Sequence, residues 1–217
     1  MFKTKNLKIE AQDLPKQLLC LEVNELLLPS TNISLCLEEP QNLTLIDNIL
    51  KDPKRFVAIL VKSTKTQKTS IGCLGKIRSF IETEDARYLI NIDGICRFNI
   101  VDFLNLKKGQ KLLKPDWTEF LQDLKISQQK IKGRLQLNYV TNDYFSIVKN
   151  EKKLKSANIK NIKDLELINL LAQNLTKQIM NQGEILRAKD INELSALYKG
   201  FMELKIAEQE SRKSLKH

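Results

Sequence analysis

The spacing of apolar residues changes near residue 115, where a strand-like pattern gives way to a helical one. Before that point, short runs of β-branched and other apolar residues recur, with Gly, Pro, Asn and Asp between them. Runs bounded by turn residues in this way predict β-strands. The predicted strands are residues 17–23, 33–38, 55–62, 70–81, 87–93 and 95–103.

One segment of this first half has a helical pattern. Residues 41–51 follow Pro40 and end before Asp52-Pro53. A helix is expected to stop there, because the residue before a proline disfavours the helical conformation. The first half therefore predicts a β-rich subdomain that carries a single helix.

Turn residues connect or interrupt the predicted strands. The polar residues 82–85 predict a hairpin connection, and Asp93-Gly94 predicts either a second tight turn or a β-bulge. Gly72 and Gly75 within a strand indicate a bend or a close backbone approach to a ligand. We favour the bend, as at the corner of a small barrel.

After Pro115-Asp116-Trp117, apolar residues recur with the 3.6-residue period of an amphipathic helix. Residues 161–164 offer helix caps, and Asp190 is the expected N-cap of a last helix that fades within residues 208–216. No repeat of fixed period appears, which argues against a solenoid. The apolar positions of the helical pattern include Ile131, Leu135, Leu137, Val140, Leu165, Ile168, Leu171, Leu175 and Ile179.

These patterns predict an α+β chain with two subdomains. The β-rich subdomain is expected over residues 12–114 and a helical bundle over residues 115–210, with residues 1–11 and 211–217 as flexible ends. The longest apolar run is residues 57–61, and the first residues are polar. The sequence therefore predicts neither a signal peptide nor a membrane span.

Charge is distributed unevenly between the two halves. The net charge is +10, of which residues 1–110 carry +3 and residues 111–217 carry +7. A candidate basic patch consists of Lys149, Lys152, Lys153 and Lys155. Such a patch can neutralise phosphates, which keeps nucleic acid open as a partner. Aromatic residues and arginine are scarce there, so a solvated linker between helices is favoured.

Composition removes several kinds of chemistry. The only histidine is His217, which argues against histidine-based catalysis and histidine-rich metal sites. The glycines near residue 72 lack the spacing of a phosphate-binding loop, and no G-x-S-x-G elbow is present. We therefore expect no enzyme activity, no metal and no cofactor.

The four cysteines have no C-x-x-C spacing, and each lies within an apolar stretch. This pattern predicts buried, reduced thiols and a reducing, cytoplasmic compartment. The four are Cys20, Cys36, Cys73 and Cys96.

A longer motif begins at Ile71. Residues 71–90 read IGCLGKIRSFIETEDARYLI, and Gly94-Ile95-Cys96-Arg97-Phe98 follow. This arrangement resembles the Lon N-terminal (substrate-binding) domain family, in particular its stand-alone bacterial members. Their pattern is V-G-x-x-G-x-I, a polar hairpin with D-G/A-R-Y, an aliphatic strand and then G-x-x-R-F. The resemblance extends over about residues 12–205, with further matches at residues 13–15, 26–29, 35–40, 116–120 and 184–190.

The resemblance implies both a fold and a function. The implied fold is a PUA-like β-pseudobarrel with one helix, followed by a helical bundle. The implied function is recognition of polypeptides without catalysis, as an adaptor or quality-control accessory without the ATPase and peptidase domains of the protease. An RNA-binding PUA-like protein that uses the basic second half is the alternative. The signature residues are Pro29, Glu39, Pro40, Gly72, Gly75, Arg87, Tyr88, Gly94, Arg97 and Phe98.

Two hypotheses concern particular side chains. We expect Arg97 to form a partly buried ion pair with Glu39 that holds the helix against the barrel, because an interior arginine requires a partner; exposure of Arg97 to solvent is the alternative. Near the subdomain junction, apolar residues are candidates for binding a polypeptide or, as we prefer for the tryptophan, for joining the two subdomains. They are Phe103, Leu104, Trp117 and Phe120.

Overall fold

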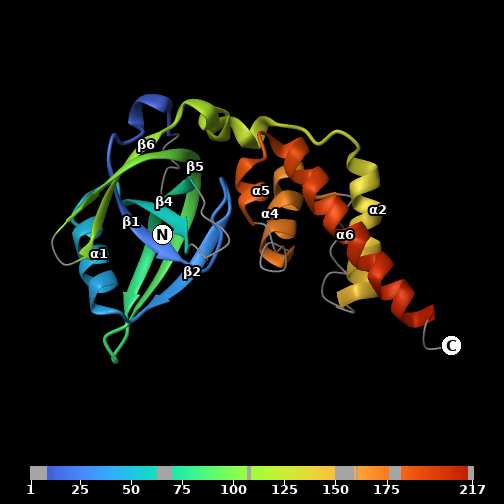
Figure 1. Ribbon diagram of the computed structural model, residues 1–217, viewed down its shortest axis with the longest axis horizontal. Helices are drawn as coiled ribbons and strands as arrows, with labels where there is room; N and C mark the ends of the chain where they lie inside the picture. The colour runs from blue at the N-terminus through green and yellow to red at the C-terminus, as the bar shows by residue number, and fades with distance from the viewer. Residues whose placement is uncertain are drawn as a thin grey trace. The chain divides into compact units, whose positions relative to one another are not determined.

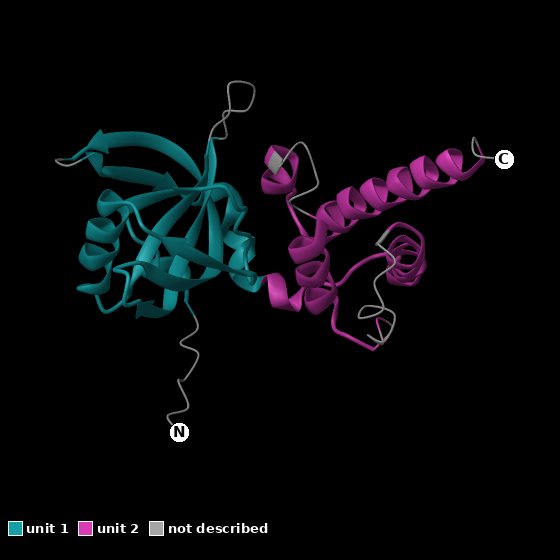
Figure 2. Cartoon of the chain, turned by 90° about the horizontal axis from the view of Figure 1, so that it is seen from below, with its two compact units in different colours: residues 1–125 teal, residues 126–217 magenta. Residues whose placement is uncertain are grey.

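The computed structural model describes residues 9–62, 70–106, 109–149, 159, 161–175 and 182–214. The chain forms two compact units, Met1–Lys125 and Ile126–His217, which Figure 2 shows in teal and magenta. Together they give the mixed α+β class that the sequence predicts.

Unit 1 contains a six-stranded sheet in the order β2-β5-β4-β3-β1-β6 (Figure 1). A further pairing between β5 and β6 closes five of these strands into a ring, and β2 lies outside the ring on β5. The strands are β1 (Leu18–Val23), β2 (Asn32–Leu37), β3 (Phe56–Val61), β4 (Ile71–Glu82), β5 (Tyr88–Asn105) and β6 (Lys111–Asp116).

Helix α1 (Pro40–Leu50) covers one side of this sheet, and the short helix η1 (Ala11–Asp13) precedes β1. Proline is accepted at the first position of α1 because no hydrogen-bond donor is needed there. The inner face of α1, made by Leu45, Ile46 and Ile49, is buried against residues of β1 to β5. The predicted helix over residues 41–51 is thus confirmed.

The sequence predicts two strands over residues 87–93 and 95–103, but the structure has one continuous strand, β5, of 18 residues. Its register with β4 shifts where Gly75 pairs with Gly94 and Leu74 pairs with Cys96, which leaves Ile95 as an extra residue. Of the two predicted alternatives at Asp93-Gly94, the bulge is therefore correct and the tight turn is wrong. A bulge adds local bend while the ladder continues on both sides.

Close packing explains the glycines of the barrel. A Cβ atom on Gly94 would lie 2.1 Å from the carbonyl oxygen of Leu28, and one on Gly72 would lie 2.5 Å from Phe98. Gly75 would similarly meet Ile92 at 2.5 Å. These glycines let side chains and backbone approach each other inside the protein.

Strand β6 was not among the predicted strands. It contains Pro115, and proline within an apolar run argues against a strand because it cannot donate to the ladder. Here Pro115 lies near the end of β6, opposite Ile100. Pairing of β6 with both β1 and β5 decides its conformation.

The described part of unit 2 is helical, as predicted. Asp190 caps α6 as expected, because its carboxylate accepts hydrogen bonds from the backbone N–H groups of Asn192 and Glu193. Helix α6 contacts both α2 and α4. None of the described helices combines the length and apolar content that a membrane crossing requires. The elements are η3 (Thr118–Gln128), which begins in unit 1, α2 (Arg134–Tyr144), η4 (Phe145–Lys149), α4 (Asp164–Leu175), α5 (Gln182–Arg187) and α6 (Ile191–Ser214).

Candidate polypeptide-binding surface

Arg97 lies in the interior of unit 1 and is paired with Asp123 from η3. The Arg97 Nε donates to Asp123 Oδ2 over 2.8 Å, and Arg97 Nη2 donates to Asp123 Oδ1 over 2.6 Å. The backbone N–H of Arg97 also donates to Oδ2 over 3.0 Å. The guanidinium lies 4.7 Å from the ring centre of Phe120. This bidentate pair joins β5 to η3.

The predicted partner of Arg97 is therefore wrong. Glu39 is exposed at the start of α1, and its carboxylate accepts a hydrogen bond from the side chain of Asn42. A buried arginine does require a carboxylate, as the hypothesis held, but Asp123 supplies it. The alternative of an exposed Arg97 is also wrong, since its side chain is 4% exposed.

Phe120 belongs to the interior of unit 1, and Trp117 is partly buried against it. Phe120 is 1% exposed, which leaves it no surface for a polypeptide. Trp117 stacks edge-on against Phe98 and donates its indole N–H to the carbonyl oxygen of Pro15. Both residues help to hold η3 and the preceding turn against the barrel.

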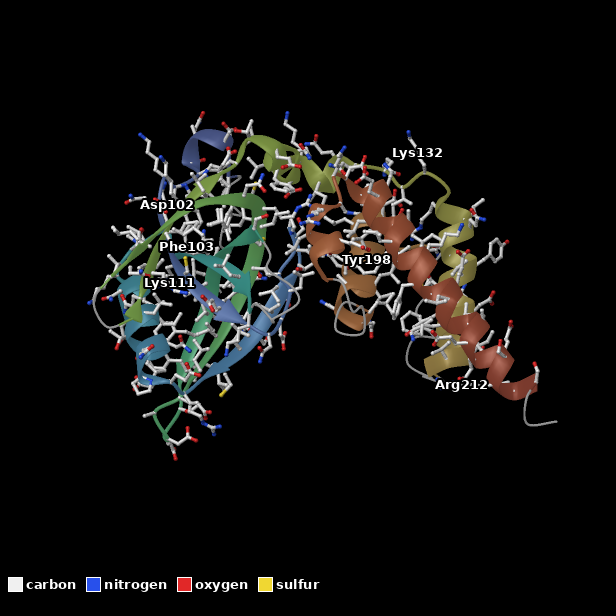
Figure 3. All side chains as sticks on the ribbon, in the orientation of Figure 1. Asp102, Phe103, Lys111, Lys132, Tyr198 and Arg212 are labelled. Carbon is white, nitrogen blue, oxygen red and sulfur yellow. The ribbon has the colours of Figure 1, made fainter. Side chains whose placement is uncertain are left out.

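Phe103 and Leu104 are exposed on the outer part of β5, where it pairs with β6. We call the exposed apolar residues of this ribbon, Val101, Phe103, Leu104 and Leu106, the ribbon patch. Phe103 and Leu104 are consecutive strand residues, so they lie on opposite faces of the ribbon. Figure 3 shows Asp102, Phe103 and Lys111 near one another on this ribbon. The Lys111 ammonium lies 5.8 Å from the Phe103 ring centre and 2.8 Å from a carboxylate oxygen of Glu22. Its hydrogen bond to Glu22 raises the pKa of Lys111.

A second exposed apolar surface lies at the other end of β5. There β2, the start of β5 and the end of β4 run side by side toward the β4–β5 turn, and we call these three segments the arm (Figure 1). Cys36, Leu89 and Ile81 lie directly opposite one another on these strands, and we call them the apolar row. Directly opposite residues share one face of a sheet. All three are exposed, with Leu89 at 43% and Ile81 at 63%.

A row of hydrogen-bonded polar side chains lies beside the apolar row. The Ser34 hydroxyl donates to Asn91 Oδ1 over 2.6 Å, and Asn91 Nδ2 donates to the Ser79 hydroxyl over 2.9 Å. These three residues occupy the same face, two positions along each strand. This bonded row holds the three strands of the arm in register next to the exposed apolar side chains.

Carboxylates gather around the turn of the arm. We call this group the acidic rim, and it consists of the exposed residues Glu38, Asp47, Glu82, Glu84 and Asp85. Arg87 pairs with Asp85 at 2.5 Å, which lowers the pKa of Asp85 to about 2 and raises the pKa of Arg87. The Tyr88 hydroxyl donates to Asp47 over 2.8 Å, and this bond raises its pKa. Five carboxylates against one arginine make this end of a basic protein acidic.

Cys36 corrects the prediction that all four cysteines are buried. It is exposed in the apolar row, whereas the other three are buried free thiols. Burial raises the pKa of Cys20 and of Cys96 to about 12 and raises that of Cys73 as well. In the described part of the chain, no three His, Cys, Asp or Glu side chains form a group that could hold a metal ion.

The remaining sequence candidates have structural positions or fall outside the described residues. Pro29 is buried, and Pro40 begins α1. In the candidate basic patch, Lys152, Lys153 and Lys155 lie outside the described residues, and the side chain of Lys149 does too. Sequence reasoning missed Asp123 and the arm. The sequence did carry a signal for the arm. Successive residues of a strand point to opposite faces, so within residues 34–37 Cys36 points away from the face that Leu35 and Leu37 share.

Comparisons with known proteins agree with this fold. The N-terminal domain of the Lon protease of the Mycobacterium avium complex has 12% sequence identity and a TM-score of 0.61, covering 87% of this chain and 98% of its own. The Lon N-terminal domain protein from Xanthomonas campestris has 16% identity and a TM-score of 0.59, covering 83% and 96%. No curated protein sequence matches this chain.

The family assignment comes from the sequence itself. The model of the ATP-dependent protease La (LON) substrate-binding domain matches residues 17–202, which include all six strands and most of the helical unit. This confirms the family resemblance of the motif that begins at Ile71. The chain belongs to the LON substrate-binding domain family.

Proposed function

We propose that this protein binds polypeptide segments through the exposed apolar surfaces of unit 1 and does not act on them chemically. Membership of a substrate-binding domain family supports a role in polypeptide binding. An adaptor or quality-control accessory is the cellular role that we propose for it. The observation that carries the proposal is the concentration of exposed apolar side chains on two neighbouring strands.

Seven of the eleven large apolar side chains that are exposed among the described residues lie on β4 or β5 or directly after β5. They form the ribbon patch and, with Phe80, the exposed part of the arm. Exposed apolar side chains that gather on one part of a protein typically mark an interaction site, whereas scattered single residues need no explanation. Strand residues also present such side chains on a rigid support.

Binding of a permanently unfolded protein tests the proposal. A reduced, carboxymethylated and fluorescently labelled protein is titrated with this chain, and its anisotropy is followed. The double variant Ile81→Glu/Leu104→Glu changes one residue in each exposed surface, at 63% and 60% exposure. Losing about 1 kcal/mol of apolar contact at each site weakens binding roughly thirtyfold.

The matched control is Leu135→Glu/Leu204→Glu in unit 2. Its residues are 72% and 58% exposed, and it introduces the same charges at equally accessible apolar positions. We expect the control to bind as the unchanged protein does. Equal affinity of both double variants, or no binding by the unchanged protein, would contradict the proposal.

A further inference from the structure

We propose that β2 accepts an extended polypeptide segment as an additional strand, and that the acidic rim selects segments with Lys or Arg at the end that lies beside it. This inference rests on the proposed function and specifies the edge and the class of segment. Its elements are an unprotected strand edge, the apolar row and the local charge.

The edge of β2 is unpaired in the described part of the chain, since β2 pairs only with β5. Edge strands are usually protected from further pairing by charged residues, proline or bulges. The sequence of β2 is NISLCL, which has neither charge nor proline, and its register with β5 has no irregularity. The outer end of β4, by contrast, has a register shift at Arg78 and a charge at that position. Strand β2 is therefore the edge open to addition.

The side chains beside this edge define what an added strand must carry. Neighbouring strands place directly opposite residues on the same face, and the faces alternate along each strand. On the outer face, a residue opposite Cys36 would extend the apolar row, and one opposite Ser34 would lie beside the bonded polar row. On the inner face, Leu35 and Leu37 favour apolar partners. The fitting segment has three consecutive apolar residues followed by a polar one.

Charge selects the residue at the other end of the segment, which lies beside Glu38. Glu38 lies two positions beyond Cys36. In an added strand, the residue two positions from the one opposite Cys36 therefore lies on the same face and beside Glu38. Leu37 pairs with Tyr88, so the chain at Glu38 continues alongside Arg87, whose guanidinium pairs with Asp85 at 2.5 Å at the turn. A Lys or Arg of the segment gains attraction here, while an acidic residue is repelled. This local preference opposes the +10 charge of the whole chain, which would otherwise disfavour basic segments.

Short labelled peptides test the inference with the intact protein. One peptide carries two lysines followed by Val-Ile-Val and then Thr, and the second has glutamates in place of the lysines. We expect the lysine peptide to bind about tenfold more tightly at low salt, with a smaller ratio at high salt. The variant Glu38→Lys/Glu84→Lys should remove this preference. The control Glu203→Lys/Glu210→Lys, which makes the same charge change at exposed positions of α6, should retain it.

N-methylation of the lysine peptide tests strand addition itself. Only every second N–H group of an added strand points toward its neighbour. Methylating one alternate set should therefore abolish binding, whereas methylating the other set should leave it nearly unchanged. Equal binding of the two methylated peptides would overturn strand addition, and equal binding of lysine and glutamate peptides would overturn the role of the rim.

Two further measurements separate the possible outcomes. The unfolded probe protein is titrated in parallel; if it binds while the peptides do not discriminate, the inference fails and the proposed function stands. If it does not bind, the proposed function fails. Sedimentation of the protein alone tests whether a second copy occupies the edge. A dimer that excludes the peptide would overturn the assignment of β2 to a foreign segment.

Discussion

Replacing Asp123 with asparagine tests the account of the buried ion pair. The substitution keeps the size of the side chain and removes the charge that neutralises Arg97. The two side chains are 4% and 1% exposed, so water does not compensate for the lost carboxylate. Two side-chain hydrogen bonds and one backbone bond converge on this carboxylate.

The expected cost follows from this burial. Removing one partner of a buried ion pair typically costs about 3–5 kcal/mol, because the other charge remains in a poorly solvated site. Asparagine retains one oxygen acceptor, so we expect about 3 kcal/mol, at the lower end of that range. For a chain of this size, such a loss lowers the midpoint of thermal unfolding by about 6–12 °C.

Trp117 supplies the assay. It is the only tryptophan of the chain, lies in unit 1 and stacks against Phe98, the neighbour of Arg97. Urea unfolding followed by its fluorescence therefore reports the unit that contains the ion pair. The control is Asp93→Asn, which removes an ion pair to Arg78 with side chains 70% and 41% exposed. We expect this control to change the free energy of unfolding by less than about 1 kcal/mol.

A comparable loss in Asp123→Asn and in the exposed control would refute the reasoning. The double variant Arg97→Met/Asp123→Leu distinguishes charge from packing. Replacing both partners of a buried pair with apolar residues of similar size is often neutral or stabilising. We therefore expect the double variant to be more stable than Asp123→Asn. If it is equally unstable, packing rather than charge explains the loss.

Three other predictions follow from backbone packing, thiol burial and surface charge. Gly94→Ala should destabilise unit 1 by about 3 kcal/mol or more, because its Cβ would meet a backbone oxygen at 2.1 Å. Gly200→Ala, on the exposed face of α6 with nothing within 4 Å, should instead stabilise by about 0.5–1 kcal/mol; urea unfolding followed by circular dichroism measures both. At pH 8, a disulfide reagent that releases a coloured thiolate should modify Cys36 quickly and the other three cysteines only after unfolding. The absorbance of the released thiolate measures both reactions. Because the pKa of Asp85 is lowered to about 2, its contribution to stability is complete above the ordinary value of 3.8 and is lost as the pH falls through about 2. An NMR titration of Asp85 should show its pKa return toward 3.8 in Arg87→Gln.

Equal stability of the two glycine variants would show that the barrel relaxes around an added methyl group. Rapid reaction of more than one thiol in the folded protein would contradict the burial of Cys20, Cys73 and Cys96. An unchanged titration of Asp85 without Arg87 would show that another group lowers its pKa.

Much of the fold of unit 1 could be predicted from the sequence because local pattern and local structure coincide there. Pro40 and Asp52-Pro53 bracket α1, and alternating apolar residues mark most strands. The motif from Ile71 to Phe98 also identifies the family, because it includes glycines whose missing side chains the packing requires. These signals are carried by residues close together in the chain.

Tertiary structure decided the partner of Arg97 and the exposure of Cys36. Asp123 is 26 residues from Arg97, and no periodic pattern relates the two positions. The leucines on either side of Cys36 suggest burial, but the pleat directs its side chain to the opposite face, and the strand order leaves that face uncovered. A sequence states which residues share a face. Whether a face is covered, and which charge meets which, depends on the strands and helices that pack beside it, and those come from distant parts of the chain.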